Sequence, residues 1–208
     1  MAAESGRSAG NLWNLLVAAG IIAAVVGLLL RGGDEPAAAR FTDLAPSAPQ
    51  RLQVASLGID APVVPIQVSP DAVLDPPRNA EDVGWWDASA EPGREDGRTV
   101  ITGHTVHTGG GALDRLREVS RGDRVDVVTD EGRMRYKVQQ VRVLGKEEVA
   151  EDAEDLFGQD DGSGRLVLVS CTDWDGTVYE SNVVVVATPL GQPVAQPRDG
   201  TARAARAR

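Results

Sequence analysis

The chain of 208 residues contains one cysteine, Cys171, and its surroundings determine what chemistry it can do. The cysteine follows residues 166–170, "LVLVS", an apolar run typical of a β-strand, and precedes a polar stretch typical of a turn. A single cysteine cannot form an intramolecular disulfide, so this thiol is either a small buried group or a nucleophile. A nucleophilic thiol needs nearby positive charge or local dipoles, because the thiolate is the attacking form.

Two histidines, His104 and His107, lie in the segment "TVITGHTVHTGGG". His104 directly follows a strand-like run and a glycine, so we expect it at a strand end, whereas His107 belongs to the glycine-rich loop. A thiol and an imidazole that meet in space can carry out covalent catalysis, in which the imidazole protonates the leaving amine. Residue types alone leave the alternative open that the cysteine is buried and the histidines are surface residues.

Residues 12–30, "LWNLLVAAGIIAAVVGLLL", are uncharged and apolar apart from Asn14. About 20 such residues in a helix cross a bilayer, so we predict a transmembrane anchor after a short N-terminal segment at 1–11. A cleaved signal peptide is the alternative, because "PAAAR" follows at 36–40, although its apolar region would be shorter. Either interpretation exports the rest of the chain, and we expect its folded domain on the extracellular side of the cell membrane.

Composition divides the remaining chain into three parts. Residues 31–50 are rich in Ala and Pro and are predicted to form a linker, and residues 190–208 lack large apolar residues and are predicted to be a disordered tail. The folded domain is therefore expected at 51–189. The formal net charge of -10 argues against nucleic-acid binding, which requires a basic face.

The pattern of the folded domain predicts an all-β structure. Runs of β-branched and apolar residues bounded by turn residues predict strands within 51–59, 62–68, 99–103, 124–129, 134–143, 166–170 and 182–188. "DEG" at 130–132 predicts a hairpin, and a change of apolar phase predicts a bulge near Gln139 and Gln140. One helix is expected at 112–119, with Leu113 and Leu116 on one face. Many strands with one or two short helices indicate a closed barrel or a sandwich.

Several short sequence motifs, and their order along the chain, resemble those of the sortases, in particular the class E and F enzymes of actinobacteria. They are Gly103-His104 at a strand end, "RGDRVDV" at 121–127, and "LVSC" at 168–171. The resemblance implies a closed eight-stranded β-barrel and a cysteine transpeptidase that cleaves the C-terminal LPxTG-like sorting signal of a secreted surface protein. It further implies that the acyl group is held as a thioester and passes to an amine of peptidoglycan or of a pilin.

The resemblance assigns the nucleophile to Cys171 and the acid/base to His104, and it leaves His107 without an expected role. Sortases also use an arginine on the strand after the cysteine, but residues 172–189 contain no Arg or Lys. We expect Asn182, which stands in that region, to donate its amide N–H to the oxyanion instead. An arginine from another strand is the alternative. The missing arginine also leaves open a weak or inactive sortase-like scaffold or binding protein at the cell surface.

No cofactor is expected. The acidic segment 147–161 has the oxygen ligands that calcium prefers, but it lacks EF-hand spacing, and a solvated helix and loop is the favoured interpretation. The histidines and the cysteine lack the spacing of a zinc site. The L,D-transpeptidases are another class of exported, cysteine-dependent enzymes on a β fold. They would place His and Cys only a few residues apart, whereas His104 and Cys171 are far apart in this sequence. Trp174 and the pair Trp85 and Trp86 are assigned to the peptide groove or to the core, and Asp173 and Asp175 to a turn.

Overall fold

The computed structural model describes residues 41–69, 73–160 and 164–194. The predicted transmembrane range 12–30, the segment 1–11, and parts of the predicted linker and tail lie outside the described residues. Within the described part of the chain, no helix is both long and apolar enough to cross a membrane.

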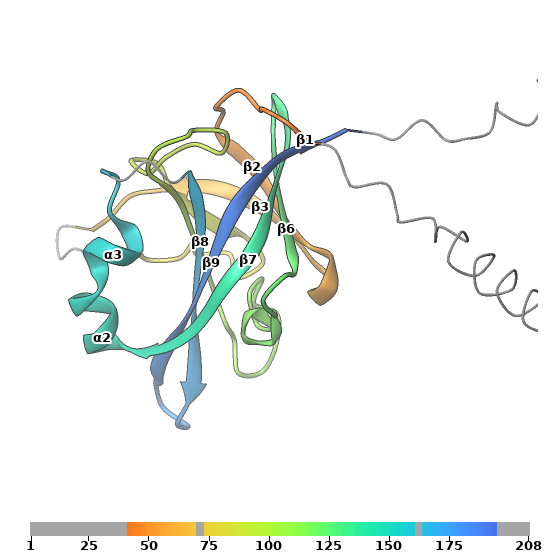
Figure 1. The fold of residues 1–208 in the computed structure, drawn as a ribbon. Helices are drawn as coiled ribbons and strands as arrows, with labels where there is room; N and C mark the ends of the chain where they lie inside the picture. Colours follow the sequence, from red (N-terminus) through yellow and green to blue (C-terminus); the bar gives the residue numbers. More distant parts are fainter. Residues whose placement is uncertain (1–40, 70–72, 161–163, 195–208) are drawn as a thin grey trace, which may run out of the picture. The chain divides into compact units, whose positions relative to one another are not determined.

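Eight strands close into a barrel (Figure 1), which confirms the predicted all-β barrel. Their order is β9-β7-β6-β2-β3-β4-β5-β8, and pairing of β8 with β9 closes the ring. A short 3-10 helix, η1 (Ala55–Leu57), joins β2 to β3. The strands are β2 Pro49–Val54, β3 Ile59–Ile66, β4 Val83–Trp86, β5 Arg98–Gly103, β6 Arg124–Thr129, β7 Gly132–Gly145, β8 Arg165–Trp174 and β9 Tyr179–Pro193.

The described fold extends beyond the range 51–189 at both ends. A further strand, β1 (Phe41–Thr42), pairs with the end of β9, so that Phe41 lies opposite Pro193. Leu44, also within the range assigned to the linker, is buried in the barrel core. The Ala- and Pro-rich composition around these residues hides so short a strand from a search for alternating patterns.

Two of the predicted irregularities are confirmed by the strand pairing. Thr129 lies opposite Gly132, so the two intervening residues form the predicted hairpin turn between β6 and β7. The register between β7 and β9 shifts between Val138 and Gln140, at the predicted bulge. Strand β4 was not predicted, because "VGWW" is too short to show an alternating pattern.

Strand β8 is apolar on both faces because both faces are covered. Leu166 and Leu168 point into the barrel core. Val167 points outward into a second cluster, beneath helices α2 (Lys146–Glu151) and α3 (Ala153–Phe157), which lie beside the barrel in Figure 1. A strand buried on both sides needs a continuous apolar run, which accounts for residues 166–169. The other buried members of the second cluster are Leu144, Leu156 and Val184.

The helix predicted at 112–119 is wrong as an α-helix, although its buried face is correct. The segment consists of turns and a 3-10 helix, η2 (Leu116–Glu118). Leu113 and Leu116 are fully buried in the barrel core. A segment this short does not sustain an isolated α-helix in water, so packing of the leucines decides the backbone conformation. In the acidic segment, α2 and α3 agree with the favoured helix and loop.

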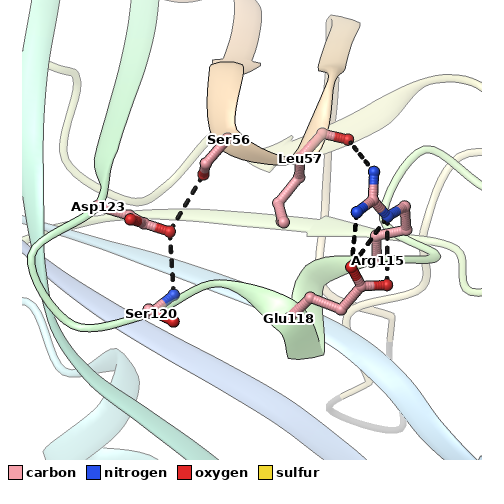
Figure 2. A network of polar contacts seen from close by, with 6 residues as sticks. All are labelled: Ser56, Leu57, Arg115, Glu118, Ser120 and Asp123. Atoms are coloured by element: carbon pink, nitrogen blue, oxygen red, sulfur yellow. Dashed lines mark hydrogen bonds and ion pairs between the residues drawn. The ribbon is translucent and has the colours of Figure 1, made fainter.

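Polar contacts fix the segment around η2 to the connection between β2 and β3 (Figure 2). The Arg115 guanidinium donates to the carbonyl of Leu57 over 3.0 Å. The carboxylate of Asp123 accepts hydrogen bonds from the Ser56 hydroxyl over 3.1 Å and the Ser120 backbone N–H over 3.0 Å. The loop that follows β5 is therefore anchored at its far end as well as at its start.

Candidate active site

The parallel pairing of β5 with β8 brings His104 and Cys171 together. The register places Gly103 opposite Ser170 at the last pair of this ladder. His104 directly follows β5, and Cys171 is the next residue along β8, so the two residues lie level with each other on neighbouring segments. Adjacent strands are about 4.8 Å apart, which puts the two backbones within reach of each other's side chains.

Strand alternation directs both side chains to the outer face of the barrel. Ser170 is buried in the interior, so Cys171 points outward, where it is half-buried. Gly103 faces the interior, and a Cβ there would lie 2.8 Å from Leu113 Cγ. His104, the next residue, therefore faces outward as well. Gly103 must be glycine because Leu113 packs directly against it.

The Ser170 hydroxyl holds the backbone on both sides of His104. It donates to the carbonyl of Gly103 over 2.8 Å and lies 2.6 Å from the Thr105 hydroxyl. The residue before the cysteine thus positions the strand end that carries the histidine. In the sequence, Ser170 appears only as part of a motif that resembles the sortases, and this contact was not predicted.

Asp114 organises the loop that follows His104. Its carboxylate accepts hydrogen bonds from the backbone N–H of Val106 over 2.7 Å and of Gly111 over 3.0 Å. The His104 carbonyl accepts from the Leu113 N–H over 3.0 Å, and a Cβ at Gly111 would lie 2.5 Å from that oxygen. The loop is therefore folded back tightly on the histidine's own backbone.

The His104 imidazole makes one hydrogen bond that defines its neutral tautomer. Its Nε2 lies 2.8 Å from the carbonyl oxygen of Pro77, in the connection between β3 and β4. A carbonyl oxygen only accepts, so Nε2 carries the hydrogen and Nδ1 is the basic nitrogen. His104 is thereby oriented by a segment that belongs to neither of the strands that position it and Cys171.

Electrostatics at Cys171 are set by two opposing effects. Burial raises the pKa of the thiol, and the positive charge of Lys146 lowers it, with burial the larger effect. The net result is a pKa above the ordinary value for cysteine. In this structure, therefore, the thiol is mostly protonated at neutral pH.

A groove of about 780 Å³ lies over the outer face of the barrel, and neighbours of Cys171 contribute to its lining. Its lining includes Val169, two residues before the cysteine, and Asn182, which lies opposite Cys171 in the pairing of β8 with β9. Trp86 also lines it, whereas Trp85 is buried in the core, so the tryptophan pair divides between the two predicted places. Most of the lining is apolar: Val68, Val73, Leu74, Val100, Val149, Ala150, Ala153 and Phe157 belong to it.

Asn182 lies on the same outward-facing side of β9 as the groove. The register places it opposite both Cys171 on β8 and Leu144 on β7. Among the described residues its side-chain amide has no hydrogen-bond partner. The structure therefore brings Asn182 beside the cysteine, as the sequence analysis expected, with its amide N–H available.

His107 stacks on Trp174, three residues after Cys171 on β8. The ring centroids are 4.4 Å apart and the rings are tilted by only 3°. Tyr179 packs against the other side of this contact, with its ring 4.9 Å from that of Trp174. Asp175 accepts hydrogen bonds from two backbone N–H groups, which confirms it as a turn residue. The stack joins the loop after His104 to the β8–β9 hairpin, a packing contact that the sequence analysis missed.

Arg117, within η2, approaches β8 on the face opposite Cys171. Arg117 forms an ion pair with Asp173 at 2.6 Å and lies 3.4 Å from the Thr172 hydroxyl. Thr172 is buried and alternates with Cys171, so it faces away from the groove.

Among the described residues, no cluster of three or more His, Cys, Asp or Glu side chains could hold a metal ion.

The comparisons with known proteins agree with this architecture. A family model for the sortase domain matches residues 52–190. The structure is similar to sortase C1 of Streptococcus agalactiae in complex with MTSET, with a TM-score of 0.54, 21% identity, and coverage of 70% of this chain and 68% of that chain. It is also similar to sortase C-1 of Actinomyces oris, with a TM-score of 0.54, 20% identity, and coverage of 68% of this chain and 71% of that chain. For sortase A of Corynebacterium diphtheriae, the TM-score is 0.55 and the identity 20%, and the match covers 78% of this chain and 66% of that chain. No curated protein matches the sequence significantly.

Ser170→Ala should lower the free energy of unfolding by roughly 1–3 kcal/mol, because the Gly103 carbonyl and the Thr105 hydroxyl lose a buried partner. Urea unfolding followed by tryptophan fluorescence measures the change. Ser170→Thr keeps the hydroxyl and is the matched control, which should lose clearly less. Equal losses in the two variants would show that the hydroxyl does not matter.

The raised pKa of Cys171 predicts slow alkylation at neutral pH. The thiolate fraction grows as pH approaches the pKa, so the rate with iodoacetamide should rise with pH to a midpoint above the ordinary value of about 8.5. Because Cys171 is the only cysteine, the label reports on this site alone. A midpoint at or below the ordinary value would mean that nearby positive charge outweighs burial.

Proposed function

This chain belongs to the sortase family, and we propose that it is a cysteine transpeptidase that cleaves an LPxTG-like C-terminal sorting signal. The observation that carries the proposal is the strand register, which sets His104 level with Cys171, beside residues that line a mostly apolar groove. A family match identifies the kind of chemistry, and this geometry supplies the two groups that the chemistry needs.

In the first half of the reaction, His104 Nδ1 takes the proton of the Cys171 thiol and becomes an imidazolium. The resulting thiolate attacks the scissile carbonyl carbon and forms a C–S bond. The carbonyl π electrons move to the oxygen, which becomes an oxyanion. When the oxyanion collapses, the C–N bond breaks and the His104 imidazolium gives its proton to the leaving amine. Nδ1 is the nitrogen suited to this transfer, because Pro77 occupies Nε2.

In the second half, an acceptor amine attacks the carbonyl carbon of the Cys171 thioester. Its surplus proton passes to His104, a new C–N bond forms, and the C–S bond breaks to return the thiolate. We propose that the acceptor is an amine of peptidoglycan or of a pilin. Water in place of the amine would give hydrolysis by the same steps.

The groove supports a peptide substrate in extended form. Its apolar lining suits the apolar residues of an LPxTG-like signal, and a peptide that reached Asn182 would bring its scissile bond close to Cys171, which lies opposite Asn182. We propose that the Asn182 amide donates to the oxyanion, because it lies opposite the nucleophile on the groove side. One such donor in an acyl-transfer enzyme is worth about 2.7–4 kcal/mol.

We also propose that residues 12–30 anchor the protein in the cell membrane with the barrel on the extracellular side. The support is the length and uncharged composition of that segment. This location would bring the enzyme to exported proteins that carry a sorting signal.

A sortase-like binding protein with little activity is the second candidate. It is favoured by the raised pKa of Cys171 and by the absence of Arg and Lys from residues 172–189. Such a protein would bind a sorting peptide in the groove without forming a thioester. The two candidates therefore differ in covalent chemistry rather than in binding.

The decisive experiment incubates the protein with a small library of LPxTG- and LAxTG-like peptides and examines it by intact-protein mass spectrometry. We expect an acyl adduct on Cys171 whose mass identifies the cleaved peptide. Cys171→Ala is the control and should form no adduct, while its melting temperature stays near that of the wild type. Peptide binding without any adduct, at neutral and at alkaline pH, would favour the binding protein.

His104→Ala should lower the rate of acylation by about 10²–10⁴-fold, the range for a missing general acid/base. His107→Ala should have a much smaller effect, because the His107 ring is engaged in a stack on Trp174. Single-turnover kinetics on one peptide measure both variants. A larger loss for His107→Ala would reverse the assignment of the two histidines.

A further inference from the structure

The residues nearest the nucleophile form a row across neighbouring strands. Cys171 on β8 lies opposite Asn182 on β9, and Asn182 in turn lies opposite Leu144 on β7. Strand β7 ends one residue later, and Lys146 is the first residue of α2. Lys146 therefore stands at the β7 end of the row, with Cys171 and His104 at the other end.

Lys146 borders the same groove as the row of residues around Cys171. Lys146 and Asn182 both contribute to its lining, together with Val169 on the outward face of β8. Of the described residues that line this groove, Lys146 is the one with a cationic side chain. Its ammonium group is therefore on the side of the barrel where a bound peptide would approach Cys171.

The position of Lys146 matches a charge that the site otherwise lacks. Residues 172–189 carry no Arg or Lys, and Arg117 is paired with Asp173 behind the strand. Lys146 makes no ion pair with a described residue. The neighbouring Glu148 is engaged in capping α2, since its carboxylate accepts from the Gly145 N–H over 2.7 Å. The ammonium charge is thus not neutralised by a direct partner.

We propose that Lys146 supplies the positive charge that stabilises the Cys171 thiolate and the developing oxyanion, in place of the arginine expected on β9. This inference rests on the proposed acyl transfer. Asn182 and Lys146 have different tasks in it, because a neutral amide can donate to the oxyanion but cannot favour ionisation of the thiol. Lys146 can do both, since an ammonium group has three donors and a full charge.

The first test measures iodoacetamide alkylation of Cys171 across pH in wild type, Lys146→Met, Lys146→Arg and Lys137→Met. Lys137 is the chain's other lysine and lies on β7 opposite Thr188 and Arg124, far along the strand from the row. We expect Lys146→Met to move the midpoint to higher pH, because it removes the charge that favours the thiolate. Lys146→Arg should keep the wild-type midpoint, and so should Lys137→Met.

Other titratable and charged groups near the thiol act in all variants alike, so the difference between variants isolates Lys146. Salt provides a second readout. Raising ionic strength screens an exposed charge, so it should shift the wild-type midpoint upward and leave Lys146→Met almost unchanged. The other groups are Glu154 and Asp160, which line the same groove, and His104, Asp114, Arg117, Asp173, Tyr179 and Glu180.

The second test measures acylation by peptide in single-turnover experiments. Lys146→Met should lower the rate more than about tenfold and Lys146→Arg should restore most of it, as for loss and recovery of an oxyanion stabiliser. Asn182→Ala should slow acylation without moving the alkylation midpoint. An unmoved midpoint in Lys146→Met, or a loss that Lys146→Arg does not rescue, overturns the proposal. If wild type forms no adduct, the proposed function fails, and the alkylation profiles still decide whether Lys146 acts on the thiol.

Discussion

The parallel pairing of β5 with β8 is the constraint on which the active site depends. Parallel strands cannot be joined by a tight turn, so the chain must leave the end of β5 and return to the start of β8 by a long crossover. That crossover contains η2, the β6–β7 hairpin and helices α2 and α3. The same stretch of chain that separates His104 from Cys171 in sequence therefore builds the barrel end and the groove wall around them.

The two faces of the barrel wall have different physical tasks. On the inner face, leucines and valines make a close-packed core, and Ser170 replaces an apolar residue where it can bind the backbone beside His104. On the outer face, Val167 is sealed beneath the helices, Val169 lines the groove, and Cys171 is half-buried at its end. The proposed nucleophile thus follows a buried part of β8, whose inner face packs into the barrel core.

The half-buried position of Cys171 has an energetic consequence. Burial disfavours the thiolate, so activity requires a compensating charge, and the groove offers one in Lys146. A thiol that is mostly protonated at neutral pH is also less readily oxidised, because oxidation follows thiolate character. For a single half-buried cysteine, a charge balance that favours the thiolate only when substrate excludes water would limit side reactions.

The sequence by itself determined most of the β-strands, the hairpin and bulge of β7, and the buried leucines of η2, because these depend on local periodicity. It also proposed His104, Cys171 and Asn182 as site residues, from short motifs and their positions. It could not determine the backbone of residues 112–119, where packing of Leu113 and Leu116 outweighs helix propensity. Only the tertiary structure decided that Ser170 binds the backbone beside His104, that His107 stacks on Trp174, and that Lys146 shares a groove with Asn182. These contacts join residues far apart in the chain, and their partners are chosen by strand register and barrel closure, which no local pattern encodes.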